Sequence, residues 1–232
     1  MTASAIVQKP IPIQPPEGVG EKSLLKQQAY DELKRLIQNA TLGPGVFLSE
    51  RQLAIQLGMS KTPVKAALER LEAEGFVAVS PQQGIVVRDL SIHEIADQFE
   101  IRLALESFVL RSLAGKLTDA HILRLKDNLR QQQLAAKQLD VTTSTRLDSA
   151  FHTLFCEFLG NQEILRVMLH LREKMHRVVT RVFEQDSNRL APSYREHKAI
   201  ADAVLAGKAN QAAAALEEHL NYGKQILLSR GR

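Results

Sequence analysis

The chain contains little cysteine and no long apolar segment, and these absences exclude several classes of protein. Cys156 is the single cysteine among 232 residues, so an intramolecular disulfide framework is excluded. No apolar run approaches the roughly 20 residues that cross a bilayer. The first residues also lack the basic segment and apolar core of an export signal. We therefore expect a cytoplasmic protein that does not use a membrane.

The chain also has little excess charge of either sign. Its formal net charge is +4, and residues 21–90 contain nine Lys and Arg against eight Asp and Glu. Non-specific electrostatics would therefore not identify a nucleic-acid-binding protein, and such a conclusion has to rest on a motif.

Length and composition indicate an N-terminal arm and two domains. Residues 1–20 hold four of the eight prolines, which predicts a flexible arm. The rest of the chain is long enough, at about 150 residues per domain, for one or two domains. We expect the first over residues 21–88 and the second over residues 89–232.

Residues 48–87 have the pattern of a helix, a tight turn, a second helix and a small hairpin. Ser49 precedes a short amphipathic segment, and Gly58 supplies the left-handed backbone that ends a helix. Ser60 stands where the next N-cap belongs, with Pro63 tolerated in the first turn. Two helices joined so closely must cross at a steep angle, as in a winged helix-turn-helix.

The second of these helices presents polar side chains near its N-terminal end. Its apolar residues recur at helical spacing and leave Lys61, Thr62 and Lys65 facing outward, at the end that reaches base edges. Residues 76–79 and 85–87 are short β-prone runs separated by turn residues, which predicts the wing. A helix-glycine-helix pair can also be a packing motif with solvated lysines, but the hairpin that follows favours DNA binding.

The segment resembles the DNA-binding domain of the GntR family of transcription regulators. That family's signature resembles LSE-x-x-LA-x-x-LG-x-S-x-TPV-x-x-AL-x-x-L-x-x-x-G, which residues 48–84 match in order. The resemblance implies that four side chains face DNA and that a glycine at the wing tip enters the minor groove: Arg51, Lys61, Thr62, Lys65 and Gly84. The family usually has arginine in place of Lys61 and Lys65. A lysine offers a point charge where arginine offers a planar fork to guanine, so base preference there should differ.

From residue 89 onward strand signals vanish and proline occurs once, which predicts an all-α antiparallel bundle. Together with a supporting helix over residues 22–40 in the first domain, the fold is expected to be mainly α. The helices expected in the bundle cover residues 91–115, 118–138, 143–159, 161–185, 191–206 and 209–229. A bundle of this kind can enclose a cavity that hosts a ligand.

Four residues of this domain have the chemistry of a metal site. Asp148 and His152 are four residues apart on one helix face, and His197 and His219 lie on two later helices. Three imidazoles and one carboxylate suit divalent zinc, nickel, manganese or iron and leave room for a ligand oxygen. A helical histidine is more often a surface or hydrogen-bonded core residue, however, and with seven in the chain some coincidence of spacing is expected. The spacing alone leaves both interpretations open.

Residues 148–152, 196–200 and 219–220 resemble segments of the effector domain of the FadR branch of the GntR family, and the likeness extends over residues 91–229. The resemblance implies that Asp148, His152, His197 and His219 bind a divalent metal, with zinc the first choice, and that the metal helps to coordinate a small carboxylate effector. Branch members that bind acyl-coenzyme A lack the full set.

Residues 97–106 resemble the first helix of the same effector domain, in which an arginine faces the cavity. Arg102 could bind a carboxylate bidentately. The alternative is an ion pair with Glu106, one helical turn away, which would contribute only a few tenths of a kcal/mol if exposed. The family usually has tyrosine where Phe99 stands.

These observations predict a homodimeric DNA-binding transcription regulator, a repressor, whose affinity for operator DNA is controlled by a small carboxylate bound beside the metal. They do not predict an enzyme. One alternative is an effector-independent repressor with a purely structural metal. A metal-dependent hydrolase is the other, disfavoured because no general acid or base stands out and the winged helix would have no purpose.

Overall fold

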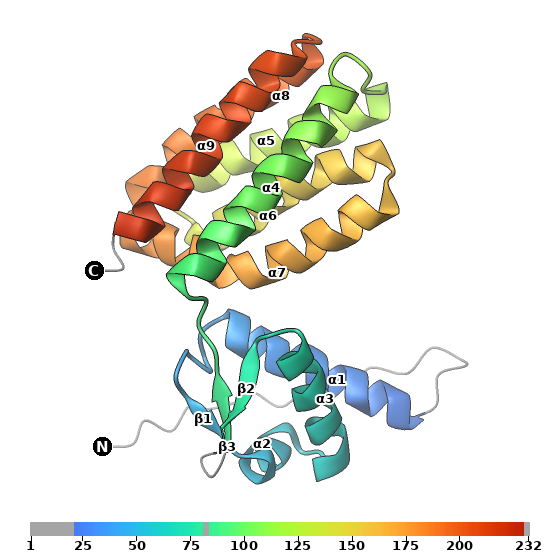
Figure 1. Ribbon diagram of the computed structural model, residues 1–232, viewed down its shortest axis with the longest axis vertical. Coiled ribbons are helices and arrows are strands. Elements are labelled where there is room, and N and C mark those ends of the chain that lie inside the picture. Colours follow the sequence, from blue (N-terminus) through green and yellow to red (C-terminus); the bar gives the residue numbers. More distant parts are fainter. Residues whose placement is uncertain (1–20, 81–83, 230–232) are drawn as a thin grey trace. The chain divides into compact units, whose positions relative to one another are not determined.

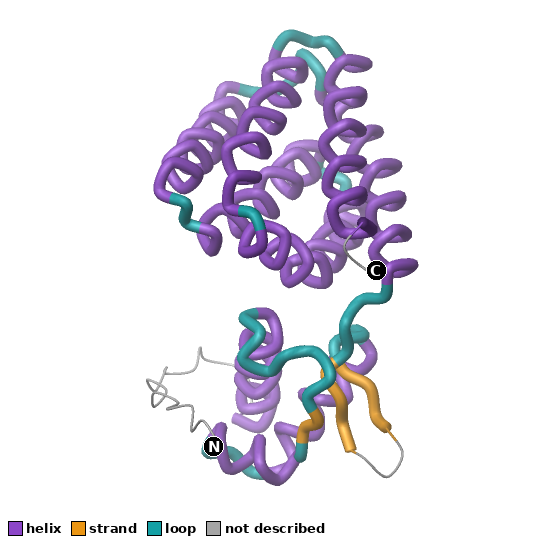
Figure 2. The backbone as a smooth tube through the Cα atoms, turned by 90° about the vertical axis from the view of Figure 1, so that its left-hand side faces the viewer, coloured by secondary structure: helices purple, strands orange, loops and turns teal. Residues whose placement is uncertain are grey.

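A computed structural model describes residues 21–80 and 84–229 (Figure 1). The predicted arm over residues 1–20 and the wing turn at 81–83 lie outside the described residues. The described elements divide into two compact units between Asp89 and Leu90, each with its own buried core. Within these elements the prediction of a mainly α protein is confirmed, and Figure 2 shows how little of the chain is strand.

The first unit has the predicted order of helix, helix-turn-helix and hairpin. Its elements are α1 (Glu21–Gln38), β1 (Phe47–Leu48), α2 (Glu50–Leu57), α3 (Lys61–Ala73), β2 (Val77–Ser80) and β3 (Gly84–Val87). β3 is the central strand and pairs antiparallel with both β2 and β1. The two-residue β1 was not predicted, because a strand so short has no periodicity of its own and depends on its partner.

The turn between α2 and α3 forms as the sequence predicts, with one difference. Gly58 ends α2 in the left-handed region at φ 64°. Ser49 and Ser60 both stand at N-cap positions with extended backbone, but neither side chain accepts a hydrogen bond from its helix. The apolar face of α3 is buried, since Val64 and Leu71 are fully enclosed, and this leaves its polar face outward.

α1 supports the recognition pair by packing along α3. Leu33 and Ile37 are fully buried in the shared core. Beside them, the Tyr30 hydroxyl donates to Glu74 Oε2 at 2.6 Å, and Lys34 Nζ lies 3.2 Å from the same oxygen. These polar contacts join α1 to the C-terminal end of α3.

The second unit is a helical bundle. Its elements are α4 (Ile92–Leu113), α5 (Asp119–Gln138), α6 (Val141–Leu159), α7 (Gln162–Gln185), the 3-10 turn η1 (Ser187–Arg189), α8 (Leu190–Leu205) and α9 (Ala209–Ser229). α4 packs against α9 and α6, and α5 packs against α6 and α8, as can be followed in Figure 1. Across the described parts of both units, we find no helix with the length and apolar character needed to span a membrane.

Two glycines meet at one end of this bundle. Gly115 and Gly207 end the α4 and α8 regions, and both have φ 72°. The Gly115 N–H donates to Val204 O at 2.9 Å. A Cβ placed on Gly115 would lie 3.3 Å from the Cα of Gly207, so the two turns are in backbone contact.

We expect Gly115→Ala to destabilise the protein more than Gly160→Ala does. Gly160 has a similar φ of 74°, but a Cβ placed there meets nothing within 4 Å. Both substitutions place an L-residue in the left-handed region, at about 1–2 kcal/mol. Only Gly115→Ala also pushes backbone against backbone. Urea unfolding followed by far-UV circular dichroism measures both losses, and equal losses would show that the glycine contact does not limit packing.

Candidate functional site

The structure brings the four predicted metal ligands together at the centre of the helical unit. α6 carries Asp148 and His152 one turn apart, α8 carries His197, and α9 carries His219. One ligand atom from each residue lies within 4.8 Å of the others, and all four residues are buried. Tertiary packing thus supplies the convergence that spacing alone left open.

The distances within this cluster suit a single divalent ion. His197 Nε2 lies 3.2 Å from His219 Nε2 and 3.6 Å from Asp148 Oδ1. Two ligand atoms bound to one ion at about 2.1 Å are separated by roughly 3.0–3.4 Å at tetrahedral or octahedral angles. In the described part of the chain, His152 Nε2 is buried with no hydrogen-bond partner. A bound cation would satisfy that nitrogen, so the residues fit a metal.

Each imidazole is oriented by an acceptor at its other nitrogen. The three acceptors are Glu106 Oε2 at 2.6 Å from His152 Nδ1, Gln132 Oε1 at 2.8 Å from His197 Nδ1, and Glu196 Oε2 at 2.7 Å from His219 Nδ1. When Nδ1–H donates outward, the lone pair stands on Nε2, which points toward the cluster. This is the tautomer that a metal ligand needs, and such outer contacts are typical of metal sites.

For His197 the direction of every bond in the outer shell can be assigned. The carbonyl of Leu147 can only accept, so Asn128 Nδ2 donates to it at 3.2 Å. Asn128 Oδ1 then accepts from Gln132 Nε2 at 2.7 Å, which turns Gln132 Oε1 toward His197. The chain of amides therefore places the proton of His197 on Nδ1.

Burial and neighbouring charges set the protonation states that metal binding requires. Burial, with the nearby charges of His219 and His152, holds the pKa of His197 well below its ordinary value. Burial also lowers the pKa of His219, an effect that its hydrogen bond to Glu196 partly offsets.

The two neighbouring glutamates are ionised in spite of burial. Burial raises the pKa of Glu106 and Glu196, but the charges of His152 and Arg102 bring that of Glu106 to about 2. Hydrogen bonds from His219 and Arg189 likewise bring the pKa of Glu196 to about 2. His197 and His219 are therefore neutral, and the carboxylates ionised, near neutral pH.

Arg102 forms the ion pair with Glu106 that the sequence offered as the alternative to a ligand-binding role, and the pair is buried. Arg102 Nε donates to Glu106 Oε1 at 2.8 Å, and the two side chains are only 9% and 5% exposed. Arg102 also lines both cavities beside Asp148. The ion pair and a ligand-binding role are thus compatible, because Glu106 holds Nε and Arg102 still faces the cavities.

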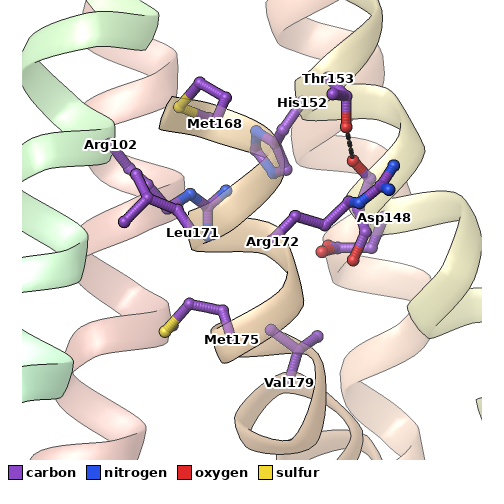
Figure 3. Close-up of a pocket in the computed structure, with 10 residues that line it drawn as sticks. Arg102, Asp148, His152, Thr153, Met168, Leu171, Arg172, Met175 and Val179 are labelled. Atoms are coloured by element: carbon purple, nitrogen blue, oxygen red, sulfur yellow. Dashed lines mark hydrogen bonds between the residues drawn. The ribbon is translucent and has the colours of Figure 1, made fainter. Parts of the chain in front are cut away.

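Two small cavities adjoin the cluster, with volumes of about 20 and 50 Å³. They share Arg102, Asp148 and Val179. The first extends along α7 past Met168 and Met175, and Figure 3 shows the basic, acidic and thioether side chains around it. Cavities of this size hold a few water molecules, so a bound ligand would have to be small.

The residues predicted to face DNA are on the surface of the first unit. Lys61, Thr62 and Lys65 are exposed at the N-terminal end of α3, and Arg51 is exposed on α2. Gly84 begins β3, at φ 93°, and pairs with Ser80 next to the turn. It is therefore the last paired residue before the wing tip.

Sequence reasoning gave no role to Asn128, Gln132 or Glu196. Asn128 and Gln132 are buried and four residues apart on α5, whose buried face otherwise carries Leu125 and alanines. An amide pair at helical spacing on an apolar face is a detectable signal, but its partner cannot be identified without the fold.

Two domain families match the chain. The FCD domain matches residues 97–222, and the family described as bacterial regulatory proteins, gntR family, matches residues 25–87.

Individual relatives agree with these matches. The HTH-type transcriptional repressor RspR of Escherichia coli K12 is 29% identical over 154 residues, covering 66% of this chain and 68% of RspR. An uncharacterized HTH-type transcriptional regulator of Streptomyces ambofaciens, in an unstable DNA locus, is 31% identical over 84% of this chain and 81% of its own. Among solved structures, E. coli McbR/YncC has a TM-score of 0.76 at 23% identity, covering 90% of this chain and 99% of that one. That structural likeness supports the fold. The matching families and these relatives are transcriptional regulators and not enzymes, as the sequence predicted.

We expect the purified protein to hold about one divalent ion per chain, and His152→Ala/His197→Ala to lose it, because two of the four ligands are removed. Elemental analysis of protein prepared without chelator measures the content. His93→Ala, an exposed histidine in the same unit, is the control and should keep the metal.

A finer test removes only the outer contact of one ligand. Gln132→Leu should weaken metal affinity by about 10–100-fold, since loss of an orienting partner has effects of that size. Gln133→Leu, on the exposed face of α5, should leave it unchanged. Equal metal content and affinity in every variant would show that the histidines are structural.

Proposed function

Because the chain belongs to the GntR family of bacterial regulatory proteins and carries an FCD domain, we propose that it is a repressor whose affinity for operator DNA is controlled by a small carboxylate bound beside a divalent metal. The gntR-type helix-turn-helix implies DNA binding, and the FCD domain implies a small-molecule effector. The observation that carries the proposal is the buried set of three inward-facing imidazoles and Asp148, with Arg102 beside it. RspR is named a transcriptional repressor, which supports repression and not activation as the role of this chain.

In this proposal α3 enters the major groove. Lys61, Thr62 and Lys65 face bases and phosphates, and Arg51 contacts the backbone. Gly84 allows the wing to approach the minor groove because it carries no side chain. A homodimer would present two such units to the half-sites of a pseudo-palindrome.

The effector site would combine Arg102 with the metal. Asp148, His152, His197 and His219 would hold the ion, with zinc the first choice and nickel, manganese or iron also suited to the donor set. The ion would supply positive charge and an open coordination position. Arg102, held at Nε by Glu106, would orient the carboxylate. Control of DNA affinity then requires that the effector bind the two DNA-binding states unequally.

We expect Lys61→Ala/Lys65→Ala to weaken binding to a duplex that the native chain selects from a random-sequence pool. Removing two lysines from phosphate or base contact should lower the slope of log affinity against log salt by about two. Fluorescence anisotropy over a salt series measures both quantities. Lys116→Ala/Lys126→Ala, which removes two exposed lysines of the helical unit, should change neither. Unchanged affinity in the first variant would rule out α3 as the recognition helix.

We also expect short-chain carboxylates to shift the affinity of the metal-loaded protein for that duplex, by about 5–150-fold for a coupled effector. The His197→Ala variant should still bind the duplex, because His197 lies in the helical unit and not in the DNA-binding unit. Its affinity for the duplex should no longer change with carboxylate, because the variant lacks one of the four metal ligands. Anisotropy titrations with and without each carboxylate measure the shift. If none of them changes DNA affinity while metal and DNA are both bound, the protein is an effector-independent repressor with a structural metal.

A further inference from the structure

The charged side chains around the metal cluster form two ion pairs and leave one carboxylate without a cationic partner. Arg102 pairs with Glu106, and Arg189 donates from both terminal nitrogens to the two oxygens of Glu196. Each arginine and its carboxylate cancel. The remaining charged group is Asp148, whose single negative charge faces an ion of charge two. With neutral imidazoles, the metal-loaded site has a net charge of plus one.

This net charge of the site is buried. The side chains of Arg102, Arg189 and Asp148 are 9%, 5% and 10% exposed. An unbalanced charge in such a place is unfavourable, and a second anion would create the opposite imbalance. Arg172, which also lines the first cavity, is exposed, so solvent screens its charge. The site is therefore balanced by one negative charge.

The rest of the cavity wall offers few groups to a polar ligand. The α7 wall of the first cavity carries Met168, Leu171, Met175 and Val179, and Ser149 lines the same cavity from α6. The apolar residues of the second cavity are Phe99, Val182, Phe183 and Leu220, with Ser193 among its polar ones. The Thr153 hydroxyl already donates to the carbonyl of Ser149, and Arg189 is held by Glu196. Hydroxyl groups on a substituent that lies against α7 would be buried against the apolar side chains of that helix, which is unfavourable without hydrogen bonds.

We propose that the effector of this chain is a small monocarboxylate with an apolar substituent, its carboxylate between Arg102 and the metal and its substituent against α7. This inference rests on the proposed function and narrows it, because dicarboxylates, tricarboxylates and sugar acids are disfavoured. The thioethers of Met168 and Met175 can adjust to the shape of the substituent, since methionine is flexible and polarizable.

Three acids of equal chain length separate the two parts of the proposal. Butyrate has one charge and an apolar body, succinate has two charges, and threonate has one charge and three hydroxyl groups. Calorimetric titration of the zinc-loaded protein should give butyrate the highest affinity, by about tenfold over each of the others, a difference typical of one unbalanced polar group.

Removing the buried negative charge of Glu106 should then change the relative affinities for succinate and butyrate. Glu106→Gln keeps the shape of the side chain and can still accept from His152 Nδ1, but its amide nitrogen then faces Arg102 Nε. The substitution raises the net charge of the site from plus one to plus two. Both acids would place a carboxylate beside Arg102, so the ratio of their affinities reports the charge and not the altered Arg102 contact. We expect the affinity ratio of succinate to butyrate to rise by about tenfold, as a second negative charge becomes balanced. Metal content is measured first to confirm that the site is intact. Glu100→Gln is the matched control, because Glu100 lies on the same helix, is 70% exposed and pairs with Lys224 at the surface.

The outcomes distinguish this inference from the function on which it rests. Tighter binding of succinate by the native protein, or a ratio that moves no more in Glu106→Gln than in Glu100→Gln, would overturn the charge count while leaving carboxylate control in place. Tightest binding of threonate would overturn the apolar substituent. If none of the acids binds while zinc is retained, carboxylate control itself is contradicted.

Discussion

The helical unit is organised around three imidazoles that must present unprotonated nitrogens to one another. Two lone pairs facing each other at 3.2 Å repel, so His197 and His219 hold this arrangement only because each is anchored at Nδ1. The anchors come from different helices. α4 supplies Glu106, α5 supplies Gln132 and α8 supplies Glu196, in addition to the ligands on α6, α8 and α9. The orientation of one small cluster therefore constrains five helices at once.

This arrangement is not explained by folding stability. Well-packed apolar side chains in place of buried ionic groups are often neutral or stabilising. The unit instead keeps the buried Arg102–Glu106 pair, the buried Arg189 with its partner Glu196, an amide chain and Asp148 in its interior, and most of their polar atoms have specific partners. A cation would account for these residues together, because its charge would offset that of Asp148 and its coordination sites would accept the inward lone pairs.

The parts of the fold that depend on neighbouring residues could be predicted from the sequence, and the parts that depend on distant ones could not. Helical periodicity placed the bundle helices within a few residues of their observed bounds, and Gly58 was recognised from local backbone preference. The candidate metal ligands were recognisable by chemistry and by resemblance. Their outer partners were not, because Glu106 and His152 are 46 residues apart and Gln132 and His197 are 65 apart. No periodicity extends over such separations. The burial of the Arg102–Glu106 pair was missed for a related reason, since four-residue spacing sets the contact and tertiary packing sets the exposure.

α7 stands apart from the other helices of this unit. Among the described residues, it contributes neither a candidate ligand nor an acceptor to the cluster, yet it supplies most of the apolar wall of the first cavity. The candidate metal ligands and most of the apolar wall of the first cavity therefore lie on different helices. Substitutions along α7 would alter the shape of the first cavity without removing any of the four candidate metal ligands. Under the proposed function, a descendant of this protein that arose by gene duplication could acquire a different effector through changes on one helix while it keeps the four candidate metal ligands.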